Sequence, residues 1–411
     1  MKIKDIVTLT TTSITPQSNE EYHLYSLPSF DDNQKREELI GSEIQSNKYI
    51  VPDKCILFNK LNVRFKRVWR IDNNDYNKIC STEFLPLVVN ESKVDYQYCY
   101  YILISDYITN YLCGQNANTS GSHKRIDPTD FLNIELPTLP AMEEQKRIGQ
   151  LLFSIDQKIA LNRAINDNLE AMAKQLYDYW FVQFDFPNEE GKPYKSTGGK
   201  MVWNDKLKRE IPEGWSSKMI GDIEGNIVTG KTPSCANEDN FGGDIPFITI
   251  DDIRGNLFVF QSQRTLSKLG ADRQSKKYLP EGSLCISCIG TIGVMGFVAR
   301  LAQTNQQINS IIFDKEYNKE FSYFSLMLHF GNAKAKTGNV FANMNKEEFA
   351  SIYTAYPSIE LLQKYHEIVL PMFDTIRTNT SEILNLTKQR DELLPLLMNG
   401  QVSVNYHLAH D

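Results

Sequence analysis

The 411-residue sequence lacks a hydrophobic run long enough to cross a membrane, since a spanning helix needs roughly 18–20 consecutive apolar residues. Residues 1–12 (MKIKDIVTLTTT) also lack the apolar core of a secretory signal. The seven cysteines are an odd number at scattered spacings, which argues against a disulfide framework and favours reduced thiols. We therefore expect a cytoplasmic protein, and the length predicts two or three domains.

The sequence has no basic excess of the kind that is typical of DNA-binding domains. It contains 44 Lys and Arg against 51 Asp and Glu, for a formal net charge of −7. Residues 1–140 contain 15 basic and 18 acidic side chains, and residues 215–356 contain 14 of each. Binding to nucleic acid would therefore require a local cluster of cations or the help of partner subunits.

No group of residues indicates a metal or catalytic centre. The six histidines lack metal-ligand spacing, and Cys285 and Cys288 form a single C-x-x-C pair without a second pair. Buried thiols are the simpler interpretation of these cysteines, because they lie in an apolar run. Gly290, Gly293 and Gly296 allow a cofactor loop, but a tight turn between strands accounts for them more simply. We expect this chain to hold no metal and no cofactor.

Residues 225–232 (GNIVTGKT) formally match the phosphate-binding pattern G-x-x-x-x-G-K-[ST]. Such a loop must be followed at once by a helix whose N-terminus holds the phosphate. Here Pro233 and the polar segment 234–243 follow instead. Nucleotide binding through Lys231 is therefore kept only as an alternative.

An internal repeat organises the chain. Residues 126–145 (IDPTDFLNIELPTLPAMEEQ) are similar to residues 344–363 (MNKEEFASIYTAYPSIELLQ). The alignment, at an offset of 218 residues (352 minus 134), pairs Phe131 with Phe349, Ile134 with Ile352 and Gln145 with Gln363. A polar, glycine-containing stretch precedes each block, at residues 119–125 and 337–343, and residues 48–58 (KYIVPDKCILF) resemble residues 277–287 (KYLPEGSLCIS).

Each repeated block is followed by a long amphipathic helical pattern, from Met142 and from about Ile359 to Asn399. Apolar residues at alternating spacings of three and four form the seam of a coiled coil. The predicted seam includes Ile148, Leu152, Ile155, Ile159, Leu169, Leu176, Val369, Phe373, Ile376, Ile383 and Leu394. Asn162 and Asn166 occupy the first stripe and predict a specific partner helix, because polar seam residues fix register. We expect the two helices to pair antiparallel and the second to end at Gly400.

The predicted fold is mixed α+β, with two β-rich globular domains joined by two long antiparallel coiled-coil helices in a pseudo-twofold arrangement. Predicted strands cover residues 98–104, 245–250 and 283–298. The two globular domains are predicted to cover residues 1–140 and 215–356. The first long helix is predicted at residues 141–185, a linker with little core at residues 186–214, and the second long helix with the tail at residues 357–411.

These features resemble the specificity subunit of type I restriction-modification systems over essentially the whole chain. The motifs are residues 134–148 (IELPTLPAMEEQKRI), 176–187 (LYDYWFVQFDFP), 199–215 ending IPEGW, 230–250 (GKTPSCANEDNFGGDIPFITI) and 390–402 (RDELLPLLMNGQV). The second helix departs from the pattern, because it lacks the pair that Glu144 and Gln145 form in the first.

The resemblance implies a non-catalytic subunit whose two target-recognition domains each read one half of an interrupted, asymmetric double-stranded DNA site. It further implies that the helices set the half-site spacing and dock two methyltransferase subunits, and that two restriction–translocase subunits join for cleavage. S-adenosylmethionine, ATP and Mg would be used by these partners. A coiled-coil scaffold without DNA function remains the other alternative.

Basic clusters are the candidate DNA contacts, since Arg reads guanine bidentately whereas Lys mainly contacts phosphate. In the first half they are Arg64, Lys66, Arg67, Arg70, His123, Lys124 and Arg125. In the second half they are Arg254, Arg264, Arg273, Lys276, Lys277, Lys334 and Lys336.

Overall fold

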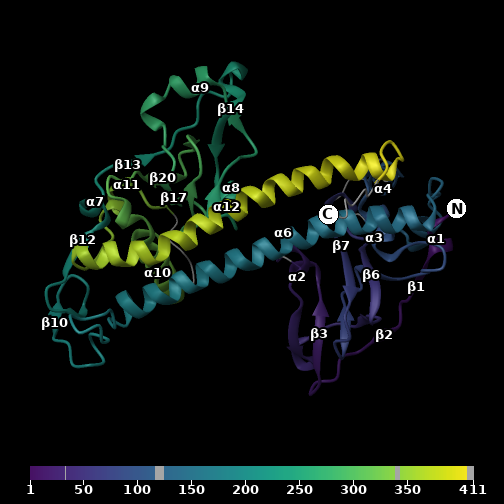
Figure 1. Cartoon of the computed structure of the whole chain (residues 1–411), viewed down its shortest axis with the longest axis horizontal. Helices are drawn as coiled ribbons and strands as arrows, with labels where there is room; N and C mark the ends of the chain where they lie inside the picture. Colours follow the sequence, from purple (N-terminus) through teal and green to yellow (C-terminus); the bar gives the residue numbers. More distant parts are fainter. Residues whose placement is uncertain (33, 116–124, 338–342, 405–411) are drawn as a thin grey trace, which may run out of the picture. The chain divides into compact units, whose positions relative to one another are not determined.

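The computed structural model describes residues 1–32, 34–115, 125–337 and 343–404 (Figure 1). The chain divides into two compact units, one formed by Met1–Ile159 with Asn385–Asp411 and one formed by Ala160–Leu384. Each unit therefore contains one globular segment together with parts of both long helices.

The first globular segment has two sheets and a set of short helices. Its strands are β1 (Val7–Leu9), β2 (Ser13–Ile14), β3 (Glu21–Tyr25), β4 (Glu37–Ile40), β5 (Lys48–Ile50), β6 (Lys54–Asn59), β7 (Val68–Asp72), β8 (Lys78–Cys80) and β9 (Phe84–Val89). Its helices are α1 (Ile3–Ile6), α2 (Leu27–Asp31), η1 (Gly41–Glu43), η2 (Val63–Phe65), α3 (Tyr96–Ile104), α4 (Asp106–Gln115) and α5 (Pro128–Leu132). One sheet has the order β1-β9-β6-β7 and the other the order β2-β5-β8-β3-β4.

The second globular segment has a closely related set of strands. They are β12 (Ser216–Met219), β13 (Ile227–Thr229), β14 (Phe241–Ile248), β15 (Phe258–Val259), β16 (Thr265–Leu266), β17 (Leu284–Ser287), β18 (Met295–Val298), β19 (Gln303–Thr304), β20 (Ile308–Ile311) and β21 (Tyr353–Tyr356). The helices are α7 (Ile220–Ile223), η4 (Glu238–Asn240), α8 (Ile250–Ile253), α9 (Lys268–Asp272), η5 (Ser275–Lys277), η6 (Glu316–Asn318), α10 (Lys319–Thr337) and α11 (Lys346–Ala350). The sheets have the orders β13-β20-β17-β18-β15, β16-β14-β19 and β12-β21.

The internal repeat is confirmed at the level of topology. The order β1-β9-β6-β7 of the first sheet recurs as β13-β20-β17-β18. In the smaller sheets, β3 pairs parallel with β8 and antiparallel with β4, and β14 pairs parallel with β19 and antiparallel with β16. The backbone amides of Ile3 and Ile220 donate to the carbonyls of Ile134 and Ile352, so each repeated block is hydrogen-bonded to the equivalent short helix of its own globular segment, α1 in the first and α7 in the second.

The repeated residues Phe131 and Phe349 are both fully buried, at the ends of α5 and α11. The predicted equivalence of Gln145 and Gln363 is wrong. Gln145 is buried, where its side chain accepts from the Asp95 amide and donates to the Pro140 carbonyl, whereas Gln363 is exposed and its neighbour Leu362 is fully buried. Gln145 is therefore equivalent to Leu362, and the offset between the two long helices is one residue shorter than the offset between the blocks before them. The pattern of burial, and not residue identity, shows which positions of the two helices correspond.

The predicted strand at residues 98–104 is also wrong, because this segment forms the helix α3. Asp95 caps it by accepting a hydrogen bond from the Tyr98 amide over 2.9 Å. Most of its aromatic and β-branched residues are buried, and a helix that is apolar on nearly all sides lacks the 3.6-residue periodicity that distinguishes it from a strand. The strands predicted at residues 245–250 and 283–298 correspond to β14 and to the pair β17 and β18.

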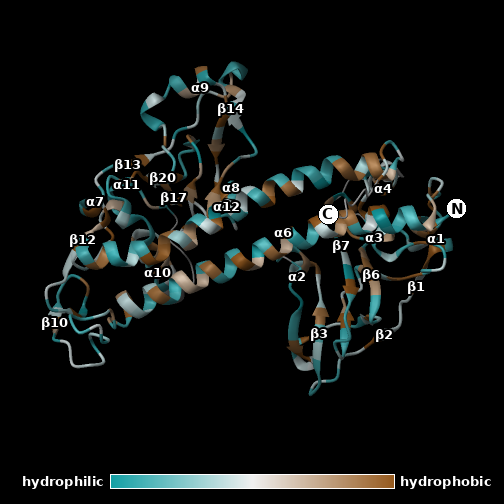
Figure 2. Cartoon of the chain, viewed as in Figure 1, coloured by the Kyte–Doolittle hydropathy of each residue, from teal (hydrophilic) through white to brown (hydrophobic). Residues whose placement is uncertain are grey.

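The two long helices are α6 (Met142–Tyr177), which continues into a π-helical turn at Asp178–Val182, and α12 (Ile359–Met398). Within each unit the helices run antiparallel, as the pairs Asp156–Arg390 in the first unit and Asn162–Glu382 in the second indicate (Figure 1). Polar and apolar residues alternate along both helices (Figure 2). Gly400 has a φ of 66°, the left-handed conformation expected at a helix end.

The predicted seam lies on the packed faces of these helices. The buried members are Ile148, Leu152, Ile159, Val369, Phe373, Ile376 and Leu394. Ile155, Leu169, Leu176 and Ile383 are partly buried. Ile148, Leu152 and Leu394 join the core of the first globular segment, and Val369 and Phe373 join that of the second. The seam thus continues into each globular core.

The segment predicted to be a linker with little core is folded. It contains the hairpin β10 (Met201–Asn204) and β11 (Arg209–Pro212). Phe186 stacks on Tyr194 and on Trp215, with ring centroids 4.7 and 5.2 Å apart. Phe184, Ile211 and Ala355 form a small hydrophobic cluster beneath it.

Candidate nucleic-acid interface

Three cations of the first predicted basic cluster, Arg64, Lys66 and Arg67, lie on the turn that joins β6 to β7. Asn59 at the end of β6 is buried, and its side-chain oxygen accepts a hydrogen bond from the Leu61 amide over 2.8 Å. Asn62 and Lys66 bound the turn in the left-handed conformation, with φ of 52° and 46°. Asn tolerates this conformation, but it costs a residue such as Lys66 roughly 1–2 kcal/mol, so the surroundings of the turn hold Lys66 in place.

Two guanidinium groups of this turn lie over one exposed aromatic ring. The Cζ atoms of Arg64 and Arg67 are 4.7 and 4.8 Å from the centroid of the Phe65 ring, and Phe65 is 52% exposed. Arg67 also forms a bidentate pair with Asp31, with Nε–Oδ1 and Nη2–Oδ2 distances of 2.7 Å. Asp31 and Phe65 were not among the predicted site residues. The aromatic residue within the basic run is visible in the sequence, but no local pattern indicates Asp31.

The second predicted basic cluster of the first half meets the same turn. The backbone of Arg125 bridges to Leu61, and the next amide, of Ile126, donates to the carbonyl of Lys60 over 3.0 Å. The Arg125 side chain pairs with Glu83, and Lys66 pairs with Asp106 at the start of α4 over 2.6 Å. His123 and Lys124 lie outside the described residues. Arg64, Lys66, Arg67 and Arg125 therefore surround one turn.

Arg70 lies elsewhere and contacts α3 and the long helix α6. Its Cζ atom is 4.3 Å from the ring centroids of both Tyr100 and Phe153, and its Nη2 atom is 3.6 Å from Asp156. Its side chain is 19% exposed. This environment is that of a residue that packs β7 against α3 and α6.

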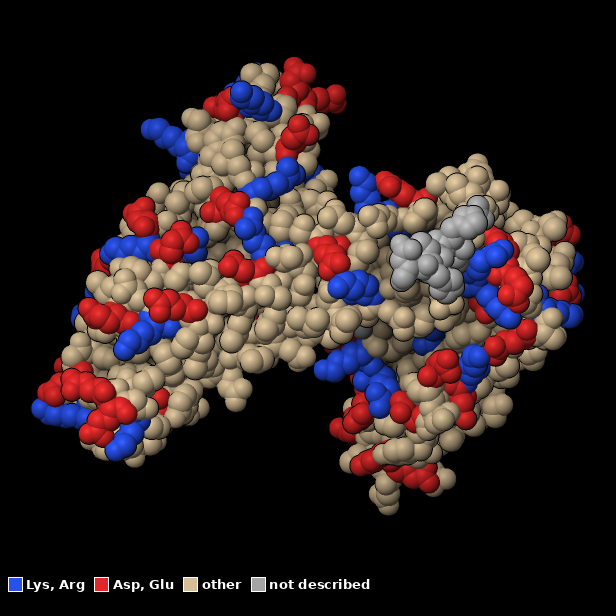
Figure 3. Space-filling view, in the orientation of Figure 1, with Lys and Arg blue, Asp and Glu red and all other residues tan. Residues whose placement is uncertain are grey.

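The predicted cations of the second globular segment do not form one cluster but lie on several different elements. Arg264 lies over the Phe241 ring at 4.4 Å, and Arg273 donates to the Asn240 side chain over 2.8 Å, so both meet at the start of β14. Arg254 is exposed beside Asp251. Lys276 is exposed and Lys277 partly buried, both on η5. Lys334 and Lys336 belong to α10, and their side chains lie outside the described residues. Figure 3 shows basic and acidic side chains interspersed over the face in view.

The turn equivalent to residues 62–66 joins β17 to β18 and is built differently. Gly290 and Gly293 take the left-handed positions, with φ of 77° and 84°. The Ser287 hydroxyl accepts from the Val294 amide over 2.8 Å, and the Met344 amide donates to the Cys288 carbonyl as Ile126 does to Lys60. Gly290 and Gly293 are thus turn residues, as predicted, whereas Gly296 lies within β18, where it pairs with Cys285 of β17.

The apparent phosphate-binding loop has the wrong geometry for a nucleotide. After β13, the amides of Gly230 and Lys231 donate to the carbonyls of Ile308 and Thr304, each over 3.0 Å. No helix follows directly, since residues 230–237 are irregular. Amides already bonded to protein carbonyls cannot hold a phosphate, so the nucleotide-binding alternative is not supported.

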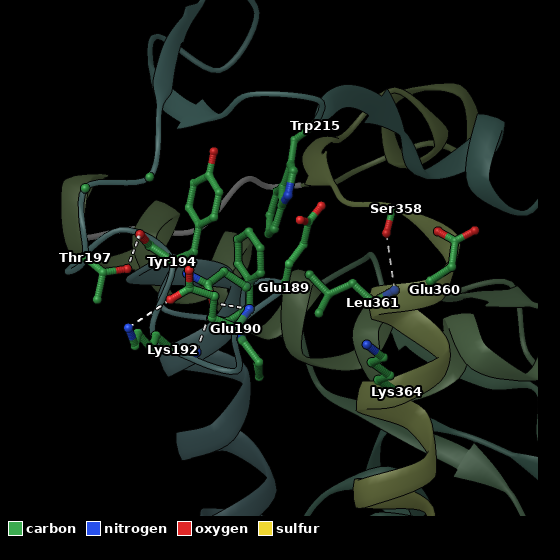
Figure 4. A pocket seen from close by; sticks show the side chains of 15 residues that line it. Glu189, Glu190, Lys192, Tyr194, Thr197, Trp215, Ser358, Glu360, Leu361 and Lys364 are labelled. Atoms are coloured by element: carbon green, nitrogen blue, oxygen red, sulfur yellow. Dashed lines mark hydrogen bonds and ion pairs between the residues drawn. The ribbon is translucent and has the colours of Figure 1, made fainter.

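An open pocket of about 740 Å³ lies beside the folded hairpin segment and the first turn of α12. Figure 4 shows Tyr194, Trp215 and the carboxylates Glu189 and Glu360 around it. Lys192 pairs with Glu190 over 2.8 Å, and the Ser358 hydroxyl caps the helix at Leu361. The residues that line this pocket include no histidine or cysteine, so they offer neither an imidazole nor a thiolate ligand to a metal ion.

The cysteines are free throughout the described part of the chain, and Cys285 and Cys288 are buried. Burial raises the pKa of the Cys285 thiol to about 12, which keeps it protonated and unreactive. The described residues contain no group of three His, Cys, Asp or Glu placed to hold a metal ion. None of their helices is both long and apolar enough to span a membrane.

Comparisons with known proteins agree with this architecture. The sequence matches the family described as "Type I restriction modification DNA specificity domain" over residues 1–171 and 212–388. It is 32% identical to the HindI specificity subunit of Haemophilus influenzae, over 84% of this chain and 86% of that protein. It is 24% identical to the MjaIX specificity subunit of Methanocaldococcus jannaschii, over 80% and 74% of the two chains.

One solved structure also supports the fold. The S subunit of a type I restriction-modification system from M. genitalium superposes with a TM-score of 0.55 at 14% identity, over 97% of this chain and 95% of that one. Two copies of the family domain, each of which includes most of one long helix, account for the duplicated sheets and the antiparallel helices described above. The chain therefore belongs to the type I restriction-modification DNA specificity family.

Proposed function

We propose that each globular segment reads one half of an interrupted DNA site, and that α6 and α12 set the distance between the halves. The chain is a DNA sequence-specificity subunit and is not itself an enzyme, as its family membership establishes. The duplicated fold is the observation that carries the proposal. Two copies of one topology with different surface turns can read two different sequences.

The partners follow from the same proposal. Two methyltransferase subunits dock on the paired helices, and two restriction–translocase subunits join them for cleavage in the cytoplasm. S-adenosylmethionine, ATP and Mg are bound by these partners and not by this chain. Exposed apolar residues on the helices, among them Leu161 and Met172 of α6 and Ile368 and Leu370 of α12, supply surface for such contacts.

The DNA contacts proposed for the first half-site are the cations around the turn between β6 and β7, namely Arg64, Lys66, Arg67 and Arg125. For the second half-site they are Arg254, Arg264, Arg273, Lys276 and Lys277, with Lys334 and Lys336 at the end of α10. With a net charge of −7, these local clusters and the partner subunits must provide the electrostatic attraction to DNA.

The test is co-expression with a candidate methyltransferase subunit in a host that lacks the system, followed by methylation-aware sequencing of the host DNA. We expect a stable complex and one motif with two specified parts, modified on adenine. A complex that forms but leaves the DNA unmodified contradicts the proposed recognition. Failure to bind any cognate methyltransferase contradicts the proposed assembly.

A further inference from the structure

We propose that Arg64 reads a guanine in the half-site bound by the first globular segment, and that Phe65, Arg67 and Asp31 position it for this task. The inference rests on the proposed function, because it assigns a base-reading role within that DNA site. It is carried by three observations on the turn between β6 and β7.

The first observation is the balance of charge on the turn. Arg67 is neutralised by a bidentate pair with Asp31, and Lys66 is paired with Asp106. Among the residues that the structure describes, no carboxylate pairs with Arg64, which is exposed. Its guanidinium donors are therefore available to an acceptor on DNA. The carboxylates of Asp31 and Asp106 lower the net positive charge of the turn and so weaken its nonspecific attraction to phosphate.

The second observation is that Arg64 is held in place before DNA arrives. Asp31 fixes Arg67, the Phe65 ring lies against Arg67, and Arg64 lies over the same ring. An arginine side chain stacked on an aromatic face loses less conformational freedom when it binds. A fixed, planar fork is what recognition of the O6 and N7 atoms of guanine requires, whereas a phosphate contact needs only a positive charge.

The third observation is the contrast between the two copies of the turn. The copy between β17 and β18 is bounded by Gly290 and Gly293, and Thr291 between them is exposed. The first copy has Asn62 and Lys66 at the left-handed positions and presents Arg64 and Phe65 between them. The same site on the fold thus carries an arginine in one copy and only small or apolar residues in the other. This difference gives the two globular segments different base preferences.

The experiment uses the complex of the full chain with its methyltransferase subunits. The wild-type complex first defines the methylated motif. Binding is then measured, over the same series of salt concentrations for every complex, to DNA duplexes in which each base pair of the motif is replaced in turn. We expect one G·C pair in one half whose replacement weakens the wild-type complex by about 5- to 150-fold.

In the Arg64→Lys complex this penalty disappears, while binding to the other half and the dependence on salt are unchanged, because Lys keeps the charge but not the fork. Arg64→Ala also abolishes the penalty and Asp31→Asn reduces it. Lys54→Ala is the matched control, because Lys54 is a surface cation at the opposite end of β6 that also lies over an aromatic ring and pairs with a carboxylate. It should retain the full penalty.

Three results would overturn the assignment. They are retention of the penalty in Arg64→Lys, an equal weakening of all duplexes with a shallower salt dependence in Arg64→Ala, and no effect of either variant. The second result identifies a phosphate contact and the third a turn that does not touch DNA. A wild-type complex that methylates no motif contradicts the proposed function itself and is recognised before any variant is made.

Discussion

Asn162 of α6 donates a hydrogen bond to Glu382 of α12 over 2.7 Å, in a helix seam where Asn162 is only 1% exposed. One turn further along, Asn379 of α12 donates to Asn166 of α6 over 2.9 Å. Buried polar pairs of this kind stabilise a helix pair less than apolar contacts do, but only one register satisfies them. The two asparagines therefore specify how α6 and α12 align in this unit, as their placement in the sequence predicted.

Truncating this polar pair from one side should be more harmful than removing it completely. We expect Asn162→Ala to lower the free energy of unfolding by about 1–3 kcal/mol, because a polar group loses a buried partner. The double variant Asn162→Leu with Glu382→Leu should recover most of that loss, since both partners become apolar. Thermal and denaturant unfolding measure both values. A double variant less stable than the single one would show that the pair stabilises the seam and does not merely fix its register.

The two globular segments are fastened to the helices by different chemistry at equivalent positions. In the first unit Asp156 accepts hydrogen bonds from the Tyr101 hydroxyl over 2.6 Å and from Arg390 over 3.0 Å. In the second unit the Phe373 ring packs edge-to-face against the rings of Phe297 and Phe324. One attachment is thus charged and the other aromatic.

These attachments should respond differently to substitution. Asp156→Ala should cost about 1–3 kcal/mol by leaving its donors unsatisfied, and Asp156→Asn should cost less because it keeps an acceptor. Phe373→Ala should cost about 3–5 kcal/mol by creating a cavity. Unfolding followed by tryptophan fluorescence measures the losses. A Phe373→Ala loss no larger than that of Asp156→Asn would contradict the packing described for the second unit.

A buried ion pair gives the second unit a pH-dependent stability. The Nδ1 atom of His366 on α12 is 2.7 Å from the carboxylate of Glu320 on α10, and Glu320 is 3% exposed. The hydrogen bond to Glu320 raises the pKa of His366 above its usual value of 6.5, with Glu316 adding to the effect and burial and Lys319 opposing it.

Because the folded-state pKa is raised, the stabilisation is complete below pH of about 6.5 and is lost as pH rises through the folded-state value. We expect the stability difference between the native chain and His366→Gln to shrink steadily from pH 6 to pH 9. Parallel unfolding series of the two proteins across this range test it. A difference that is constant or grows with pH would contradict the ion pair.

Lys231 should not be a nucleotide ligand, despite its place in the sequence GNIVTGKT. The amides that would hold a phosphate are bonded to Ile308 and Thr304. We expect calorimetry of the isolated chain with ATP and Mg²⁺ to show no heat of nucleotide binding that depends on Lys231. Lys231→Ala should match the wild type in that measurement. Saturable ATP binding that Lys231→Ala abolishes would restore the rejected alternative.

The long elements of the fold were predictable because their patterns extend over many residues. The seam of α6 and α12 persists for several helical turns, and the repeat around Phe131 and Phe349 is marked by residues that are buried in both copies. Predictions failed where a short segment had to be judged by local composition. The aromatic composition of α3 favours a strand, and only its burial against the sheet and α6 shows that it is a helix. The identical residues Gln145 and Gln363 suggested that the helices share the offset of the blocks before them, which they do not.

The candidate site was only partly predictable for the same reason. The basic run around Arg64 is visible in the sequence, but its members have different partners in space. Arg70, a few residues further on, packs against Phe153 and Asp156 of α6. Asp31 fixes Arg67 from a helix 36 residues away in the chain. Pairings of this kind depend on the sheet order β1-β9-β6-β7 and on α2, and no periodicity in the sequence encodes them.

The most direct test of the central claim is an exchange of the globular segments within the methyltransferase complex. Residues 1–140 and, separately, residues 215–356 are replaced by the corresponding segments of a relative with a different known motif, and the methylated sites are sequenced. Independent recognition of two half-sites predicts that each exchange changes one half of the motif and leaves the other half intact. A change in both halves after either exchange, or in neither, by complexes that assemble and methylate DNA, would contradict it.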